Sequence, residues 1–346
     1  MPHLNLCANQ GSVGGGEVML FAIAQAARSL GHEATVIAPE QPGEVAREAA
    51  ALGFSTVALP GDSTAGYLRH LRRWDARERN GILWCNGLRP AVATAGHRRR
   101  IVHLHQEPHG VQHILMSIAR TGSMATLVPS EFMARRIPRT RVLENWVEEP
   151  SGTKDGSIQR DPQSPVIGYL GRLSSDKGVP ILCEAVATLR ERDLNPTLLL
   201  AGESRFVSEA DATRVDAAIA TLGATAVRKG WMDRAEFFDS VDLAVFPSVW
   251  DEPFGLVAAE AMAARCPFVV SDAGALPEVA GPGYPFVAAR GDAASLAAVI
   301  EDALSEPAAD VVNHSYRRWA GHYSPWTGAY RLKSLLDDLI KDTPTS

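Results

Sequence analysis

The chain has 346 residues and a net charge of −6, and 46% of its residues are hydrophobic. This length exceeds that of one compact domain and favours two similar units joined by a hinge. The hydrophobic residues occur in short runs, none long enough to cross a bilayer, so we expect a soluble protein. The net negative charge argues against a nucleic-acid partner, which would require concentrated positive charge.

The beginning of the chain lacks the basic residues, long apolar segment and small-residue cleavage site of a secretory signal, so we expect a cytoplasmic location. The cysteines lie far apart, inside or beside apolar runs, with no close pair that would hold zinc. We therefore expect reduced core thiols at Cys7, Cys85, Cys183 and Cys266.

Short β-rich runs alternate with Ala-rich helical stretches along the whole chain, which predicts an α/β fold with helices on both faces of parallel sheets. In the first half the expected strands are Leu4 to Ala8, Ala34 to Ala38, Ser55 to Leu59, Ile82 to Cys85, Ile101 to His105 and Ala125 to Pro129. The arginine-rich segment Tyr67–Arg79 places Tyr67, Leu71 and Trp74 on one helical stripe. We expect a surface helix docked by that stripe, and peripheral contact with an anionic membrane is the less favoured alternative.

The polar segment Pro150–Pro165 is rich in Gly, Pro and Ser and is typical of a linker or long loop. The strands expected after it are Val166 to Leu170, Thr197 to Ala201, Ala226 to Trp231, Leu243 to Pro247 and Phe268 to Ser271. After Ser305 the pattern is helical. We therefore expect a first domain at 1–150, a second at 151–315 and a closing helix at 316–346, with packing back on the first domain as one arrangement for that helix.

Ligands of open parallel sheets bind at the carboxyl ends of the strands, where loops lead into helices. The first such loop, Asn9–Glu17, leads into a helix expected at Val18–Leu30. Its Gly15 and Gly16 would let backbone N–H groups approach a phosphate or sugar. The spacing does not fit the G-x-G-x-x-G dinucleotide pattern, and a simple tight turn is the alternative interpretation.

The loop Gly171–Gly178 also follows an expected strand and offers two cations. Arg172 can bind phosphate oxygens through its planar fork, and Lys177 adds a mobile charge. Together they would neutralise a diphosphate leaving group without a metal ion. We therefore expect neither a metal site nor another cofactor.

The segment Pro247–Met262 contains two glutamates, Glu252 and Glu260, separated by seven residues. Glu252 is expected in a loop and Glu260 in the following helix. The first amides of this helix, at Gly255 and Leu256, would hold a diphosphate, with one carboxylate on each side of it. Carboxylates accept paired hydroxyl groups, so one glutamate would hold a sugar and the other a ribose. The alternative is a helix-capping Glu252 and a surface Glu260, but the alanines around Glu260 favour a buried carboxylate.

These motifs resemble those of the GT4 family of retaining glycosyltransferases, and the resemblance spans almost the whole chain. The matching segments of the second half are Tyr169 to Gly178, Leu200 to Glu203, Pro247-Ser248 and Glu252 to Ala263. Those of the first half are Gly15-Gly16-Glu17, Pro129-Ser-Glu131 and Asn145-Trp-Val147. Trp146 and Arg265 stand where the family commonly has glycine.

The resemblance implies a GT-B fold, with two facing Rossmann-like domains and a cleft between them. It assigns acceptor binding to residues 1–150 and binding of a nucleotide sugar to residues 151–315. The catalytic residues it implies are His105, Glu252, Arg172 and Lys177, with His103 and His109 as neighbouring alternatives to His105. The donor-binding set is Gly15, Gly16, Arg172, Lys177, Glu203, Trp231, Met232, Glu252, Phe254, Gly255, Leu256 and Glu260.

In this assignment Arg172 and Lys177 hold the donor diphosphate, Glu252 the transferred sugar and Glu260 the ribose, while His105 faces the sugar. Trp231 and Met232 either lie along the base or simply pack. The implied activity is transfer of a hexose from a nucleoside-diphosphate sugar to an acceptor hydroxyl with retention. UDP is favoured over GDP as the commoner carrier. The alternatives are a GT-B-like sugar-nucleotide epimerase and a catalytically inactive nucleotide-sugar-binding module.

Overall fold

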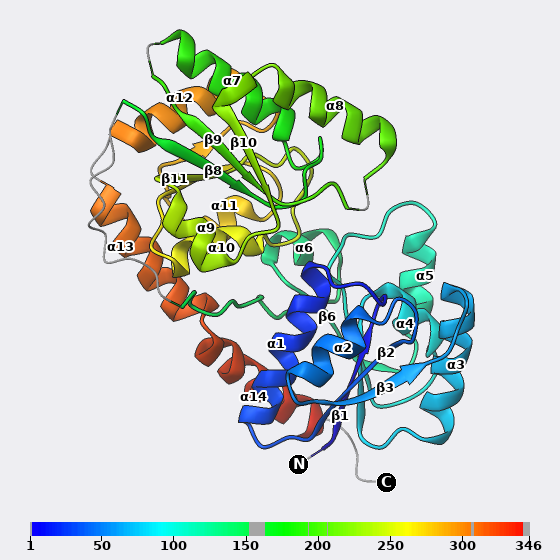
Figure 1. Cartoon of the computed structure of the whole chain (residues 1–346). Helices are drawn as coiled ribbons and strands as arrows, with labels where there is room; N and C mark the ends of the chain where they lie inside the picture. Colours follow the sequence, from blue (N-terminus) through cyan, green and yellow to red (C-terminus); the bar gives the residue numbers. More distant parts are fainter. Residues whose placement is uncertain (1, 152–162, 193, 206, 306–307, 342–346) are drawn as a thin grey trace. The chain divides into compact units, whose positions relative to one another are not determined.

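The computed structural model describes residues 2–151, 163–192, 194–205, 207–305 and 308–341 (Figure 1). The chain divides into two compact units, unit 1 with Met1–Trp146 and Pro325–Ser346, and unit 2 with Val147–Ser324. Most of the expected linker, at 152–162, lies outside the described residues, as do residues 342–346 of the closing segment. Each unit is an α/β layer structure, as the alternation of strand and helix patterns predicts.

Unit 1 is built on a parallel sheet with the strand order β3-β2-β1-β4-β5-β6-β7. The strands are β1 (Leu4–Ala8), β2 (Ala34–Pro39), β3 (Ser55–Leu59), β4 (Ile82–Asn86), β5 (Arg100–His103), β6 (Ser123–Val128) and β7 (Arg141–Val142). The helices are α1 (Gly15–Ser29), α2 (Glu44–Ala51), α3 (Thr64–Arg77), α4 (Leu88–Ala93), α5 (Gln112–Ala119), α6 (Glu131–Arg136) and α14 (Pro325–Lys341).

The core of unit 1 lies on both faces of this sheet because successive strand side chains point to opposite sides. Leu4 and Leu6 of β1 pack with α1, α2 and α14, whereas Cys7 packs with α3 to α6. The stripe of Tyr67, Leu71 and Trp74 on α3 is buried in the second of these clusters, which confirms the predicted docked helix.

The helix α14 belongs to unit 1 although it follows unit 2 in sequence, and Figure 1 shows it beside α1. Leu332, Leu336 and Leu339 recur every three or four residues and enter the same core cluster as α1. Gly328 lies against the indole of Trp146, so closely that a Cβ there would come within 2.2 Å of Trp146 Cδ2. The large side chain at 146 thus requires a residue without a side chain on α14.

Unit 2 is built on a second parallel sheet, with the order β10-β9-β8-β11-β12-β13. The strands are β8 (Val166–Leu170), β9 (Thr197–Ala201), β10 (Ala226–Gly230), β11 (Leu243–Phe246), β12 (Phe268–Ser271) and β13 (Val287–Ala288). The helices are α7 (Val179–Glu191), α8 (Glu209–Ala220), α9 (Arg234–Ser240), α10 (Leu256–Ala263), α11 (Leu276–Ala280), α12 (Ala293–Ser305) and α13 (Ala308–Arg318).

The two faces of the second sheet are covered by α7, α8 and α12 on one side and by α9, α10 and α11 on the other. A 3₁₀ turn, Gly223–Thr225, precedes β10, and a π-helical turn, Trp319–Tyr323, follows α13. Trp319 and Tyr323 are buried in the core of unit 2, so this unit continues to Ser324, beyond the expected boundary at 315. None of the described helices combines the length and apolar character that a membrane span requires.

The predicted strands are all present, with ends that differ by at most two residues. The short edge strands β7 and β13 were missed, because two residues give no periodicity. The helix α1 begins at Gly15, not Val18, so Gly15 and Gly16 form its first turn instead of a loop. The strand β5 ends at His103, so His105 lies in the following loop rather than at the strand end.

Candidate functional site

Both sheets have a topological switch point, where the strand order reverses direction. In unit 1 it lies between β1 and β4, and in unit 2 between β8 and β11. Loops that leave neighbouring strands toward opposite faces separate there and leave a crevice at the carboxyl ends. The predicted site loops of unit 2, Gly171–Gly178 and 247–255, flank the β8/β11 switch point.

An ion pair joins these two loops. Lys177 Nζ lies 2.5 Å from Glu252 Oε1, and the Ser248 hydroxyl donates to the same oxygen at 2.6 Å. Ser248 is in turn held by Ser271, whose hydroxyl donates to the Ser248 carbonyl at 2.6 Å. Residues far apart in sequence therefore converge on one buried carboxylate at the carboxyl ends of the central strands.

The turn after Lys177 explains why the loop approaches β11 so closely. Gly178 has a φ of +77° and precedes the first residue of α7. A Cβ at this position would lie 1.8 Å from the Pro247 carbonyl oxygen, so only glycine fits both the conformation and the space. The K-G pair of the sequence thus places the Lys177 ammonium beside Glu252.

Arg172 is the second predicted cation, and its guanidinium forms an ion pair with Asp176 in the same loop. A cavity of about 360 Å³ adjoins it, lined by Arg172, Ser174, Asp176, Val207, Ser208 and Asp211. Asp211 accepts a hydrogen bond from the Ser175 amide at 3.1 Å, and hydrogen bonding with the side chain and amide of Ser175 lowers the pKa of its carboxyl. The two cations of the loop are thus both paired with carboxylates in this structure.

Glu260 is 7% exposed, as the surrounding alanines predicted, and the surface alternative is wrong. Its Oε1 lies 3.4 Å from Arg234 Nε, while its Oε2 is buried without a hydrogen-bond partner among the described residues. Such an acceptor is costly to leave unpaired and suits a hydroxyl donor from a ligand. The helix start is capped by Gly255 and not by Glu252, so the capping alternative is wrong too.

The remaining predicted donor residues of unit 2 differ in accessibility. Trp231 is 72% exposed, so core packing is wrong for it, whereas Met232 is a core residue. Phe254 is buried edge-to-face against Tyr323, with ring centroids 5.4 Å apart. Glu203 is exposed, and its carbonyl oxygen accepts a hydrogen bond from the Leu173 amide at 3.1 Å.

Unit 1 places His105 in a defined network with Asn86 and Gly16. Asn86 Nδ2 donates to the Gly16 carbonyl at 2.9 Å, so its Oδ1 faces His105 Nε2, 2.7 Å away. His105 therefore carries its proton on Nε2, which leaves Nδ1 as an acceptor. Burial lowers the pKa of His105 to about 4, so the imidazole is neutral at neutral pH.

Asn86 was not predicted as a site residue, and Glu17 and Ser248 were named only as parts of the family motifs. Asn86 ends β4 at the switch point, and this position was its only available signal. Glu17 is buried and occupies the third residue of α1, where its carboxyl accepts a hydrogen bond from the Gly14 amide. Burial raises the pKa of Glu17 to about 7. His103, an alternative to His105, is fully buried against Trp84 and is a core residue.

Two parallel-sheet units, each with polar loops at its own switch point, are characteristic of GT-B glycosyltransferases. Residues 13–146 match the family model described as Glycosyltransferase Family 4, and residues 152–320 match the model Glycosyl transferases group 1. The chain therefore belongs to the GT4-type glycosyltransferases, as its motifs indicated.

Curated relatives support this membership over part of their length. An α-maltose-1-phosphate synthase of Mycobacterium tuberculosis is 32% identical over 214 residues, which cover 56% of this chain and 53% of the relative. A glycogen synthase of the same organism is 39% identical over 149 residues, or 41% of this chain and 34% of the relative. The matches thus span about a third to a half of the relatives.

Among solved structures, Anabaena Alr3699/HepE in complex with UDP and glucose aligns with a TM-score of 0.82. The alignment covers 97% of this chain and all of the other at 20% identity. At this identity the likeness shows the fold alone, and it confirms the predicted GT-B class.

Proposed function

We propose that the protein transfers a hexose from a nucleoside-diphosphate sugar to an acceptor hydroxyl, with retention of anomeric configuration. The observation that carries this proposal is the Lys177–Glu252 pair at the unit 2 switch point, with the unpaired Glu260 oxygen on the helix that follows. Family membership and the UDP held by a structural neighbour support it. The second unit then binds the donor, and the first binds the acceptor.

In the donor complex, the diphosphate replaces the carboxylates as the partner of both cations. Arg172 and Lys177 bind phosphate oxygens, and the first amides of α10, at Gly255 and Leu256, add donors that have no acceptor within the helix. Glu252, released from Lys177, accepts hydroxyl groups of the transferred sugar. Charge on the leaving diphosphate is thus stabilised by groups fixed before the reaction, without a metal ion.

The nucleoside is held at the other end of the site. Glu260 Oε2 accepts a ribose hydroxyl, and the exposed indole of Trp231 provides a surface on which a base can stack. We favour UDP over GDP because the solved neighbour holds UDP. Phe254 and Met232 are core residues of unit 2 that support these loops, rather than direct contacts.

His105 of unit 1 acts as a neutral group on the transferred sugar, as the family resemblance implies. Its Nδ1 accepts a sugar hydroxyl, while Asn86 fixes the ring from Nε2. Gly16 holds Asn86 in turn, and the absence of a side chain there leaves room for the ring, since a Cβ would lie 3.5 Å from His105 Cδ2. Gly15 and Gly16 also expose the first amides of α1.

The decisive experiment is a thermal-shift titration with UDP, GDP and ADP. One nucleotide at about 100 times its Kd stabilises the folded state by about 2.7 kcal/mol. Glu260→Ala and Arg172→Ala are expected to abolish that shift. Arg192→Ala is the matched control, because it removes another exposed arginine–carboxylate pair of unit 2, with Glu301 at 2.8 Å.

Product analysis then separates transfer from the alternatives. An acceptor-dependent release of nucleoside diphosphate, with a product of unchanged anomeric configuration by NMR, supports transfer. Conversion of the nucleotide sugar to its epimer without nucleotide release would indicate the epimerase. A shift with UDP in the absence of either reaction would indicate a binding module, and no shift with any nucleotide would overturn the donor site.

A further inference from the structure

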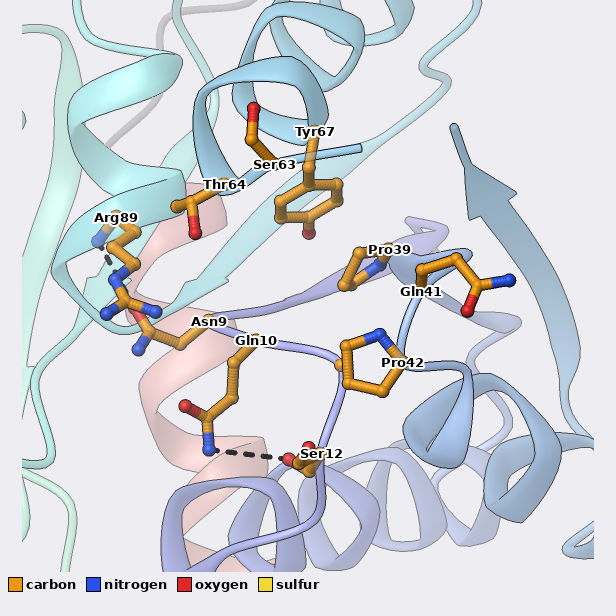
Figure 2. A pocket seen from close by; sticks show the side chains of 11 residues that line it. Asn9, Gln10, Ser12, Pro39, Gln41, Pro42, Ser63, Thr64, Tyr67 and Arg89 are labelled. Carbon is orange, nitrogen blue, oxygen red and sulfur yellow. Dashed lines mark hydrogen bonds between the residues drawn. The ribbon is translucent and has the colours of Figure 1, made fainter. Parts of the chain in front are cut away.

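In addition to the cavity of unit 2, a cavity of about 200 Å³ lies in unit 1, at the carboxyl ends of β1 and β2 (Figure 2). It lies on the β1 side of the switch point, next to the first residues of α3 and α4. The lining residues are Asn9, Gln10, Gly11, Ser12, Pro39, Gln41, Pro42, Ser63, Thr64, Tyr67 and Arg89. This volume is smaller than the roughly 300–1,000 Å³ of drug-sized sites and suits a ligand of monosaccharide size.

The walls of the cavity are joined by hydrogen bonds that involve the backbone. The Asn9 amide oxygen accepts a hydrogen bond from the Arg89 amide at 3.2 Å, and Gly87, with a φ of +124°, lets it approach. A Cβ on Gly87 would lie 2.5 Å from that oxygen, so no other residue fits. The Val45 amide donates to the Gly11 carbonyl at 3.0 Å, which joins the first loop to α2. The cavity is therefore a built feature and not a gap between mobile loops.

The lining combines polar side chains with two prolines, and Gln41 lies beside these prolines. Figure 2 shows Arg89, Thr64 and Asn9 on one side, facing Pro39 and Pro42 on the other. Sugars and cyclic polyols present the same combination, hydroxyl groups around the ring edge and C–H groups on its faces. Neutral amide and hydroxyl groups can both donate to and accept from hydroxyl groups, so the lining suits a ligand of this kind.

Arg89 is the one charged side chain among these lining residues, and it is exposed. Its guanidinium takes part in no hydrogen bond or ion pair that the described residues provide. The nearby carboxyl of Glu17 feels its charge, but burial raises the pKa of Glu17 to about 7, so that carboxyl is only partly ionised at neutral pH. An arginine that makes no ion pair with the described residues, in a cavity that also contains the Thr64 hydroxyl, is suited to an oxyanion.

We infer that this cavity binds the acceptor, and that the acceptor is a hydroxyl-rich, ring-sized group carrying one oxyanion, a phosphate ester or a carboxylate. Arg89 binds the oxyanion, and the amide side chains of Asn9 and Gln10 bind ring hydroxyls. This inference deepens the proposed function and rests on it for the identity of the ligand as an acceptor.

The test uses the full chain with saturating UDP, which fills the donor site and prevents anions from binding at Arg172 and Lys177. Inorganic phosphate is then titrated against chloride of equal ionic strength, with the melting temperature as readout. We expect phosphate to raise the melting temperature of the wild type but not of Arg89→Gln. The matched control is Arg77→Gln, an exposed arginine in the last turn of α3 at its far end, which should behave as wild type.

A second arm compares glucose with glucose 6-phosphate, glucuronate and vesicles of phosphatidylinositol under the same conditions. Binding of an anionic member at least about tenfold tighter than glucose, lost in Arg89→Gln, is expected for a charge-assisted hydrogen bond. The preferred member shows whether the oxyanion is a soluble phosphate, a carboxylate or a lipid headgroup. Equal phosphate shifts in wild type and Arg89→Gln, or no shift in either, would overturn the inference. Failure of UDP itself to bind would instead refute the proposed donor site.

Discussion

Glu17 gives the sharpest test of the electrostatics in unit 1. It is 4% exposed, and burial raises the pKa of its carboxyl from 4.5 to about 7. The folded state therefore holds a proton that the unfolded state releases between these values, so the stability contributed by Glu17 is present below pH 4.5 and lost as the pH rises to about 7. A shift of this size corresponds to about 3 kcal/mol.

Glu17→Gln removes the ionisation while keeping an oxygen that can accept the Gly14 amide. Relative to wild type, we expect the variant to gain about 3 kcal/mol in the free energy of unfolding between pH 4.5 and pH 8. Urea denaturation of both proteins at each pH measures this difference, because other titrating groups cancel in the comparison. A difference between the two proteins that does not change with pH would refute the reasoning.

Three further predictions address packing, the imidazole and the thiols. Gly328→Ala places a Cβ 2.2 Å from the Trp146 indole and should cost about 1–3 kcal/mol in urea unfolding, whereas Gly321→Ala, with no atom near its Cβ, should cost less. Burial lowers the pKa of His105 to about 4, so this imidazole should produce no limb near pH 6.5 in the profile of kcat/KM against pH. A limb near pH 6.5 that disappears in His105→Gln would contradict this. All four cysteines are buried and free, so a thiol reagent should modify them only at the rate of unfolding, and rapid labelling of the native protein would contradict this.

The sequence predicted the regular parts of the fold well because strand burial leaves a direct record in composition. The strands β1, β3, β8, β9 and β12 begin and end as predicted, and all of them except the mostly exposed β3 are short buried runs. The start of α1 was misplaced because three glycines have low helix propensity. In the folded unit the Val18 amide donates to the Gly14 carbonyl at 2.9 Å, so the helix begins within the glycine run.

The residues of the candidate site could be predicted from the sequence, but the contacts between them could not. Gly171–Gly178 and the Glu252–Glu260 segment were found because polar residues at strand ends contrast with the apolar runs before them. The contact between Lys177 and Glu252 depends on β8 and β11 being neighbours, and strand order has no signal in a single sequence. For the same reason Arg89 and Asn86, which follow and end β4, gained meaning only when β4 was placed beside β1.

The pairing of each loop cation with a carboxylate has a consequence for the proposed reaction. An ammonium beside Glu252 and a guanidinium beside Asp176 leave the empty loop nearly neutral, so no large charge is held out of water before the donor arrives. A diphosphate must compete with these carboxylates, which reduces its net affinity. Because of this competition, Glu252 becomes available to the sugar only after a phosphate has replaced it as the partner of Lys177. Binding of the diphosphate and recognition of the sugar are therefore coupled. We expect Glu252→Gln to bind the free nucleoside diphosphate more tightly than wild type, because the Lys177 ammonium then loses its competing anion. The same variant should lose sugar transfer. Weaker binding of the nucleotide by Glu252→Gln would show that the pair does not compete with the donor.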